Sequence, residues 1–311
     1  MNDIISELKY LGSQMKQSLY EELKSNIKGL SHSKKNGNKV GQIKFKSEVK
    51  SLNLKQYNNT YKILSDKKMK IQGVKNPIRV NGLNQFINIK NIEYANAKIL
   101  NLPTGYYIAI TTFIYKDDIK ENKIDDIIGL DFGISSNLTT SKGYKYNMMM
   151  QESDRLKRLQ TKLNRQNKGS KRRYKTISLI KKEYQKISNR KNDYVNKLVH
   201  DICKYKIVVI QDEQIFKWKN DVFSDKIHHS ILGILKAKLI NKNNVIVLNK
   251  YLPTTKLCTK CNTKNDKIKL SDRIFICPNC GYTEDRDIHA AKNMIDIYKI
   301  LVGMDIPILS A

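Results

Sequence analysis

The chain has 311 residues and carries 58 Lys and Arg residues against 29 Asp and Glu residues, a formal net charge of +29. This length allows a real hydrophobic core in two or three structural units. Its large basic excess is typical of proteins that bind nucleic acid, because basic side chains displace the counterions condensed on phosphates. With no run of 18 uncharged apolar residues and no basic amphipathic anchor, the sequence argues against a membrane partner.

The N-terminal third predicts a helix followed by a β-rich region. Apolar residues in the first 25 positions recur at roughly helical spacing, which favours a packing helix. From Lys39 to Ile114, short strand-like runs alternate basic and apolar residues, as in a small β-barrel with one face in the core and one facing phosphate. The runs are KVGQIKFKS, YKIL, KMKIQGV, PIRVNGL, AKILNLP and YYIAITTFIY, and the polar linker KDDIKENKIDD follows them to about residue 126.

The next segment alternates buried strands with basic helices. An apolar strand over Ile127–Leu130 delivers Asp131 at its end, and Gly133 permits a tight exit. Residues 151–200 form a long helical region rich in Lys and Arg, broken near QNKGSKRRY. The basic run at this break is either a solvated turn or, beside an acidic site, a clamp on a nucleic-acid strand. Its candidate nucleic-acid-binding residues are Lys168, Lys171, Arg172 and Arg173.

A second buried strand, Lys206–Ile210, ends in Gln211, Asp212 and Glu213. A helix over about His228–Leu239, a short strand (VIVLNK) and a final helix (AAKNMIDIYKIL) complete the pattern. Alternating β and α elements favour one mixed sheet with helices packed on it.

Four cysteines form two Cys-x-x-Cys pairs, Cys258/Cys261 and Cys277/Cys280, with fifteen residues between the pairs. Two such knuckles complete a tetrahedral shell of thiolates, which is typical of a closed, structural zinc site. The alternatives are two disulfides or a redox-active pair. The chain shows no signal peptide and is too large to depend on disulfides, so zinc is favoured.

Three carboxylates lie far apart in sequence, each where an element ends or begins: Asp131, Glu213 and Asp287. Carboxylates at one sheet edge can bind a pair of divalent ions for phosphodiester cleavage, and Mg²⁺ suits such oxygen ligands. Taken singly, each acid is more commonly a helix cap or a solvated strand end, and Glu284 and Asp285 are cap candidates. Only the set of three indicates a catalytic site.

The middle acid depends on strand register. Side chains alternate along a strand, so Gln211 and Glu213 share a face while Asp212 points to the other. Glu213 is therefore the preferred ligand if the strand stays regular, and Asp212 is the weaker candidate.

These motifs resemble the TnpB proteins (the OrfB transposase-associated family), compact relatives of type V CRISPR effector nucleases. The matching segments are GLDFGISSN, SNRKNDYVNKL, IVVIQDEQIFKW, LPTTKLCTKC and FICPNCGYTEDRDIHAAKNM, in the family's order. KVGQIKFKS and KIQGVKNPIRVNGL resemble the family's wedge domain. The similarity covers most of the chain from about residue 38 onward.

The resemblance implies an α/β fold with an RNase H-like (RuvC) mixed sheet and flanking helices, an N-terminal β-barrel-like wedge domain and an inserted four-cysteine zinc ribbon. We expect an N-terminal helix and linker at residues 1–37 and the wedge at 38–125. The nuclease domain is expected at 126–257 and 282–311, interrupted at 258–281 by a zinc module that binds target nucleic acid.

The resemblance also implies an RNA-guided DNA endonuclease of a mobile element, in which base pairing with guide RNA reads the target sequence. By motif, Asp131, Glu213 and Asp287 become the catalytic Mg²⁺ ligands, and Cys258, Cys261, Cys277 and Cys280 become the zinc ligands. Guide RNA and target DNA are the expected partners, and the prokaryotic cytoplasm or nucleoid is the expected location. Self-association is left open.

The chain departs from the family pattern in three places. His289 stands where Asn is usual, which can perturb the position of Asp287 without removing a ligand. The middle motif reads Gln-Asp-Glu in place of the commoner Glu-Asp-Leu, which moves the acid by two residues. The N-terminal portion is short, since one helix precedes the barrel-like strands.

Two other functions stay open. One is a guided DNA-binding regulator that does not cleave, which would be expected to lack the acids. The other is a DNA-binding accessory to transposition that uses no guide and needs no carboxylate triad.

Overall fold

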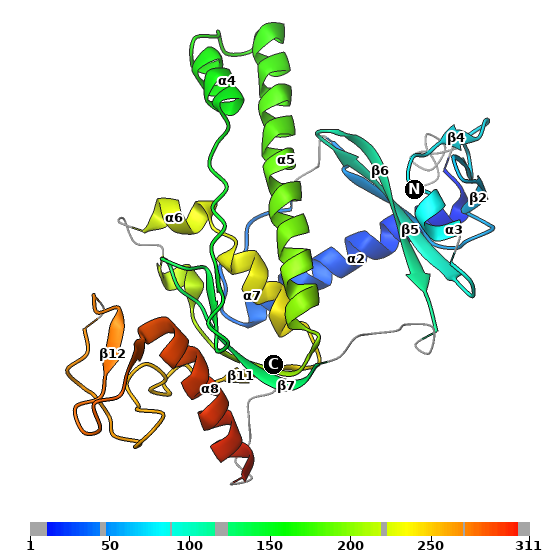
Figure 1. Cartoon of the computed structure of the whole chain (residues 1–311). Helices are drawn as coiled ribbons and strands as arrows, with labels where there is room; N and C mark the ends of the chain where they lie inside the picture. The colour runs from blue at the N-terminus through cyan, green and yellow to red at the C-terminus, as the bar shows by residue number, and fades with distance from the viewer. Residues whose placement is uncertain are drawn as a thin grey trace. The chain divides into compact units, whose positions relative to one another are not determined.

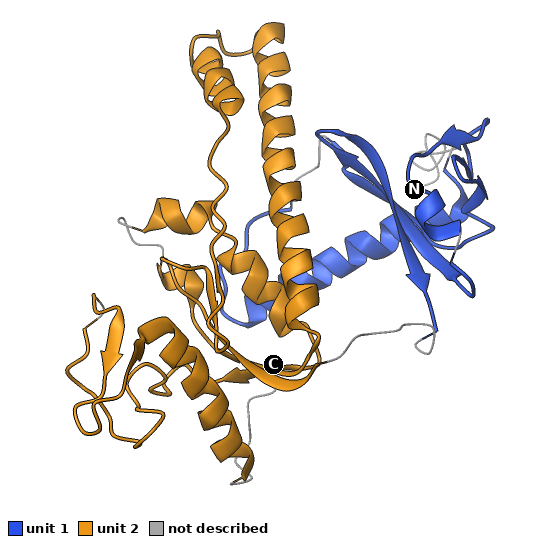
Figure 2. Ribbon diagram, in the orientation of Figure 1, with its two compact units in different colours: residues 1–120 blue, residues 121–311 orange. Residues whose placement is uncertain are grey.

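The computed structural model describes residues 11–43, 48–87, 89–115, 124–218, 223–269 and 271–303. The chain divides into two compact units, residues 1–120 and 121–311 (Figure 2). The finer five-part division expected from the sequence stays a prediction. In the described ranges no helix is long and apolar enough to cross a membrane.

Unit 1 packs a helix and two small sheets around one core. Helix α2 spans Ser13–Lys35, not the first 25 residues, and positions 1–10 lie outside the described residues. Met15 of α2 is buried with Leu54, Tyr61 and Met69. One antiparallel sheet has the order β1-β5-β6 and the other β2-β3-β4. Their bounds are β1 Ser51–Leu54, β2 Tyr61–Ser65, β3 Lys68–Ile71, β4 Ile78–Arg79, β5 Glu93–Leu102 and β6 Gly105–Phe113, with a short helix α3 at Asn84–Ile87.

Two expectations for unit 1 differ from the described residues. Strand β1 was not predicted, whereas the predicted run at 39–47 is irregular over 39–43 and its last four positions lie outside the described residues. No pairing joins the two sheets among the described strands, so closure into a barrel stays a prediction.

Unit 2 is built on a mixed five-stranded sheet of order β11-β10-β7-β8-β9. The central strands are β7 (Ile124–Asp131) and β10 (Tyr205–Gln211), and β10 runs parallel to both β7 and β11 (Val245–Leu248). Strands β8 (Leu138–Thr140) and β9 (Lys145–Tyr146) add antiparallel hairpins. The mixed α/β architecture expected from the sequence is confirmed, although β7 takes in the end of the expected linker.

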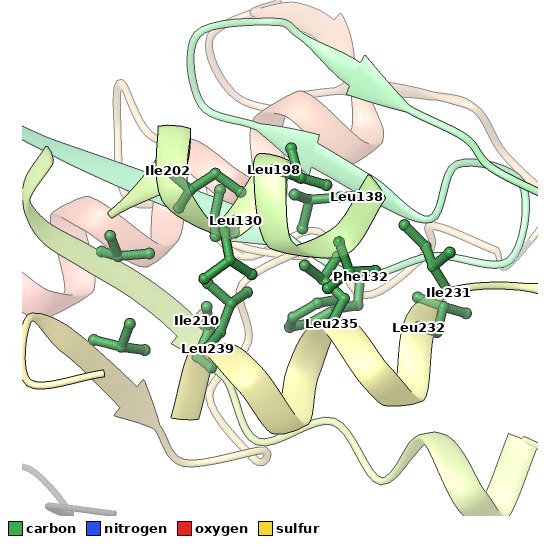
Figure 3. Close-up of a cluster of buried hydrophobic side chains, with 14 of the residues drawn as sticks. Leu130, Phe132, Leu138, Leu198, Ile202, Ile210, Ile231, Leu232, Leu235 and Leu239 are labelled. Atoms are coloured by element: carbon green, nitrogen blue, oxygen red, sulfur yellow. The ribbon is translucent and has the colours of Figure 1, made fainter. Parts of the chain in front are cut away.

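Alternation along the central strands gives the sheet two apolar faces. Leu130 and Ile210 point into the larger core, where helix α7 (Leu232–Ile240) contributes Leu235 and Leu239 (Figure 3). The intervening residues, such as Val209, point to the opposite face, where Met294 of helix α8 packs. Asp131 is an even number of residues from Gly129 and Ile127, so it belongs to the face that α8 covers.

The remaining helices follow local signals. Helices α4 (Asp154–Asn164) and α5 (Lys171–Ile202) lie side by side (Figure 1) and begin after the capping serines Ser153 and Ser170. The single helix expected near His228–Leu239 is wrong in detail. It is divided into α6 (Ser224–His229) and α7, because Ser230 has extended backbone geometry and its hydroxyl accepts a hydrogen bond from the N–H of Leu232.

Candidate metal centre and carboxylate edge

The four cysteines form one compact cluster. Their Sγ atoms all lie within 4.8 Å of one another, and this is the one such group of His, Cys, Asp or Glu side chains found in the described residues. The Sγ atoms of Cys258 and Cys280 are 3.7 Å apart, and those of Cys261 and Cys277 are 3.4 Å apart. A tetrahedral zinc shell with Zn–S bonds near 2.3 Å requires about 3.8 Å between sulfurs. The cluster therefore fits zinc, and all four thiols are free of disulfides.

The cysteine knuckle, the segment from Cys258 to Asp285 that carries both cysteine pairs, has a small hydrophobic core of its own. Cys258, Phe275 and Cys277 are buried together, and the ribbon of β12 (Ile274–Ile276) and β13 (Thr283–Asp285) supplies Phe275. Hydrogen bonds from Thr263 lower the pKa of Cys261 to about 5. A thiolate is the form of cysteine that binds a metal, so zinc binding would displace the remaining thiol protons of the cluster.

A glycine lets the last helix approach the central strand. A Cβ atom on Gly129 of β7 would lie 1.9 Å from the backbone carbonyl oxygen of Ala291, so no side chain fits there. Helix α8 (Arg286–Gly303) crosses β7 at this point, with Ala290 and Ala291 fully buried. The close crossing brings the first turn of α8, which carries Asp287, toward the end of β7, which carries Asp131.

The start of α8 is set by an acidic cap. The Asp285 carboxylate accepts hydrogen bonds from the backbone N–H groups of Asp287 (3.1 Å) and Ile288 (3.2 Å), as expected for a cap candidate. Lys145 pairs with the same carboxylate at 2.7 Å. The helix thus begins at Arg286, ahead of the AAKNMIDIYKIL segment expected from the sequence, and Asp287 lies in its first turn.

The electrostatics of Asp131 link the three predicted acids. Burial raises the pKa of Asp131 well above its ordinary value, and the charges of Asp287 and then Glu213 raise it further. Arg286 opposes this effect. These charges act on Asp131 from the first turn of α8 and the turn after β10, and the Arg286 guanidinium lies 3.8 Å from Asp287.

The strand does not stay regular through the middle acid. β10 ends at Gln211, and the N–H of Glu213 bonds back to the Gln211 carbonyl at 2.8 Å, a tight turn. Strand alternation therefore does not decide between the two acids. Asp212 is held by Lys236 at 2.7 Å with its side chain half exposed, whereas Glu213 is among the charges that act on Asp131. Burial raises the pKa of Glu213, and Lys236 opposes this.

Gln211 has a structural role in joining two loops. Its buried amide donates to the carbonyls of Asn249 (3.1 Å) and Leu252 (2.9 Å), and its carbonyl oxygen accepts from the Thr254 hydroxyl (2.9 Å). This set of contacts, the Gln211 clasp, fixes the segment after β11 against the end of β10.

His289 packs the cysteine knuckle onto α8. Its fully buried ring stacks on Phe275 with centroids 3.8 Å apart. Nε2 lies 2.8 Å from the Leu257 carbonyl oxygen and 3.0 Å from the Asn293 amide nitrogen. Burial lowers the pKa of His289. The residue that replaces the family's Asn therefore makes its contacts with the knuckle, and Asn293 one turn later donates to Thr254 and Leu257.

The basic turn between α4 and α5 divides into two kinds of residue. The Arg173 guanidinium donates to the carbonyls of Leu163 (2.6 Å) and Gln166 (3.1 Å), so it caps the end of α4. Lys168, Lys171 and Arg172 are exposed. The exposed three keep the predicted nucleic-acid role as an open prediction, whereas Arg173 has a structural one.

Asp131, Glu213 and Asp287 lie where β7 and β10 end and α8 begins, a region that we call the carboxylate edge. It offers oxygen ligands of the kind that Mg²⁺ prefers. A partly buried acid whose charge is opposed by two neighbouring acids is an arrangement that a divalent cation would relieve. In the described residues the three acids do not form a compact ligand set of the kind that the cysteines form. Sequence reasoning missed Arg286, Lys145 and Gly129. Arg286 alone had a local signal, its place between Asp285 and Asp287.

Comparison with known proteins matches two family models to unit 2 and the segment before it. A model described as "Probable transposase" (OrfB of IS605) matches residues 112–212, and one described as "Cas12f1-like, TNB domain" matches residues 228–294. The first match contains Asp131, and the second contains Asp287 and all four cysteines.

Several curated proteins are similar in sequence. A Streptomyces pristinaespiralis protein named "Putative RNA-guided DNA endonuclease" is 30% identical over 178 residues, which cover 54% of this chain and 44% of that protein. An Escherichia coli K12 protein named "Putative RNA-guided DNA endonuclease InsQ" is 24% identical over 54% of this chain and 48% of its own length. TnpB-like protein L79 of Acanthamoeba polyphaga mimivirus is 25% identical over 42% of this chain and 27% of its own length. The matches thus span less than half the length of these relatives.

Proposed function

Since the chain belongs to the TnpB (OrfB) family, we propose that it is an RNA-guided, Mg²⁺-dependent DNA endonuclease that hydrolyses phosphodiester bonds at guide-matched targets. The observation that carries the proposal is the effect of the Asp287 and Glu213 charges on the buried Asp131 carboxyl, which links acids from three separate segments of unit 2. The names of the similar proteins support the same reaction class.

Asp131, Glu213 and Asp287 would hold the metal ions. When bound, Mg²⁺ supplies an activated water and charge stabilisation at the leaving oxygen of the phosphodiester. The protein itself positions the three acids. Gly129 sets the closeness of α8 to β7, the Asp285 cap fixes the first turn of α8, and Lys236 holds the backbone at Glu213 through a 2.6 Å hydrogen bond to its carbonyl.

The finer assignments belong to the same proposal. Unit 2 would be a RuvC-like nuclease domain with the cysteine knuckle as its target-nucleic-acid-binding module, and unit 1 would contain the wedge-like domain. Guide RNA and target DNA are the proposed partners, in the prokaryotic cytoplasm or nucleoid. Zinc would be structural and Mg²⁺ catalytic.

The test uses full-length protein purified from cells that also transcribe the DNA flanking its gene. Bound RNA is sequenced, and cleavage of a plasmid matching that RNA is measured with and without Mg²⁺. Asp131→Ala should lower the rate about 10³-fold or more, because bound metal contributes several kcal/mol to the transition state and each 1.4 kcal/mol is a factor of about ten. Binding of the matching plasmid should change little.

Asp125→Ala is the matched control. Asp125 lies on the same strand, six residues before Asp131, and pairs on the surface with Lys206. Its loss should leave cleavage within about twofold, since exposed ion pairs contribute little. Bound RNA without cleavage by the unsubstituted protein would favour a guided regulator, and the absence of RNA would leave a guide-free DNA-binding accessory.

A further inference from the structure

Two exposed aromatic rings stand on neighbouring loops of unit 2, outside the carboxylate set. The first is Phe216, in the 3-10 turn η2 (Ile215–Trp218) that follows β10. Ile215 is buried and Trp218 packs against the larger core, so the turn is anchored on both sides of the ring. Phe216 itself is 68% exposed, and the ammonium group of Lys217 lies 5.9 Å from its ring centroid.

The second ring is Tyr251, three residues past the end of β11. It is 82% exposed, the highest value among the large apolar or aromatic side chains described as exposed. Its neighbour Leu252 packs against the core on the α8 face, and the Tyr251 N–H bonds to the Asn249 side chain at 3.0 Å. Lys250 places its ammonium group 4.8 Å from the Tyr251 ring centroid. Each loop therefore buries an aliphatic anchor and displays one aromatic ring with a lysine beside it.

The Gln211 clasp holds the two loops at one edge. β10 and β11 are parallel, with Gln211 opposite Leu248, so both loops leave the sheet at its carboxyl end. β7 is parallel to β10 as well and ends at the same edge with Asp131. Neighbouring strands are spaced by about 4.8 Å, so the end of β11 lies about 10 Å from the end of β7. Both loops thus leave the sheet on the β10–β11 side of the edge at which β7 ends in Asp131.

Single exposed apolar side chains are ordinary on protein surfaces and by themselves indicate nothing. Here two rings lie on loops that leave the same sheet edge, and each has a lysine ammonium group beside it. Exposed aromatic rings on which bases stack, with lysines for the phosphates, are the combination by which proteins hold unpaired nucleic-acid strands. The strongly positive chain has the matching charge.

We propose that Phe216 and Tyr251 form a base-stacking platform that binds unpaired DNA nucleotides beside the carboxylate edge, with Lys217 and Lys250 contacting the phosphates. The platform deepens the proposed nuclease function and rests on it, since it would hold a single strand next to the acids. Its binding of single-stranded DNA requires neither a guide match nor cleavage, so it can be tested separately.

The experiment measures anisotropy of a short fluorescent oligothymidylate titrated with the full-length Asp131→Ala protein at several salt concentrations. Phe216→Ala and Tyr251→Ala should each weaken binding by about 5- to 150-fold, the equivalent of about 1–3 kcal/mol per stacked base. The slope of log affinity against log salt should not change, because no phosphate contact is lost. Phe216→Tyr and Tyr251→Phe keep the ring and should bind within about twofold of the parent.

Lysine variants provide the contrasting signature. Lys217→Ala and Lys250→Ala should each reduce the magnitude of the salt slope by about 0.7, the value for one phosphate contact on a single strand. Tyr144→Ala is the matched control, because Tyr144 is 64% exposed in the turn between β8 and β9, away from the carboxyl ends of the parallel strands. Its affinity should equal that of the parent protein.

Two results would overturn the platform. Unchanged affinity in both alanine variants would do so, as would an equal loss of affinity for a fully paired duplex, since stacking requires unpaired bases. Neither result bears on whether Asp131→Ala abolishes plasmid cleavage. Conversely, loss of oligothymidylate binding in the alanine variants would support the platform even if the unsubstituted protein cleaves no plasmid.

Discussion

The cysteine cluster and the carboxylate edge differ in how the chain assembles them. The cysteines lie within 23 consecutive positions, Cys258 to Cys280, and form a compact set around a small core of their own. The acids come from the end of β7, the turn after β10 and the first turn of α8, so their approach depends on the pairing of β7 with β10 and on the crossing of α8 over β7 at Gly129. A local motif needs correct spacing, whereas a convergent site needs correct packing.

The largest expected effect comes from a substitution in the cysteine cluster. Cys277→Ser removes one thiolate from the proposed zinc shell, and the free energy of zinc binding is part of the folding free energy in small zinc domains, on the order of 10 kcal/mol. Bound zinc should fall from about one per chain toward zero, and residues 258–285 should lose protection in hydrogen exchange. Cys203→Ser is the control, because Cys203 lies outside the cluster. An unchanged zinc content in Cys277→Ser would contradict the assignment of this cysteine as a ligand.

The next largest effect comes from a substitution that disturbs the packing of α8 on β7. Gly129→Ala places a methyl group against the Ala291 carbonyl, which is backbone and cannot turn aside. We expect a loss of about 1–3 kcal/mol in the free energy of unfolding, as for other overpacked positions, together with slower plasmid cleavage. Denaturant titration and the cleavage assay measure the two separately.

Gly233→Ala, in α7 with open space around its added Cβ, provides the comparison and should be neutral or slightly stabilising. Full cleavage by a destabilised Gly129→Ala protein would show that the acids do not depend on the close crossing of α8.

The smallest expected effect concerns the charge of Asp131 and its influence on stability. The raised pKa of Asp131 means that its ionised form destabilises the metal-free fold at neutral pH. Asp131→Asn should therefore raise the melting temperature by a few degrees at pH 7 in Mg²⁺-free buffer. The difference should shrink as pH falls through the folded-state pKa and vanish below the ordinary value of 3.8, where both states are protonated. Thermal melts across pH measure it, and a lower melting temperature for Asp131→Asn at pH 7 would contradict it.

The same contrast explains what the sequence could predict. Apolar runs at Ile127–Leu130 and Lys206–Ile210 predicted two central strands, because buried parallel strands are continuously apolar. The cysteine spacing predicted the cluster for the same local reason. Strand alternation could not settle the middle acid, since Gln211 ends β10 and its amide turns to the loop after β11. The role of Gly129 was out of reach, because no local pattern tells which helix will cross it.

The exact ends of the helices were also beyond what the sequence could predict. α8 begins at Arg286 because the Asp285 side chain caps it, yet several acids close together read equally well as a solvated turn. The division of α6 from α7 at Ser230 depends on a hydroxyl that bonds to the backbone at both sides, to the Ile227 carbonyl and the Leu232 N–H. Such choices between local and helical hydrogen bonds are decided by small energies.

Anchoring at both ends of the knuckle has a consequence for how the chain can vary. The Gln211 clasp and Asn293 fix the segment entering at Thr254 and Leu257, while the Asp285 cap fixes the exit into α8. Between fixed ends, lengthening a flexible loop costs only about 0.6 kcal/mol for each doubling of its length. The stretch between the two cysteine pairs can therefore gain or lose residues over generations while the sheet beneath keeps its geometry. The surface of this module can therefore change without refolding the sheet that carries Asp131.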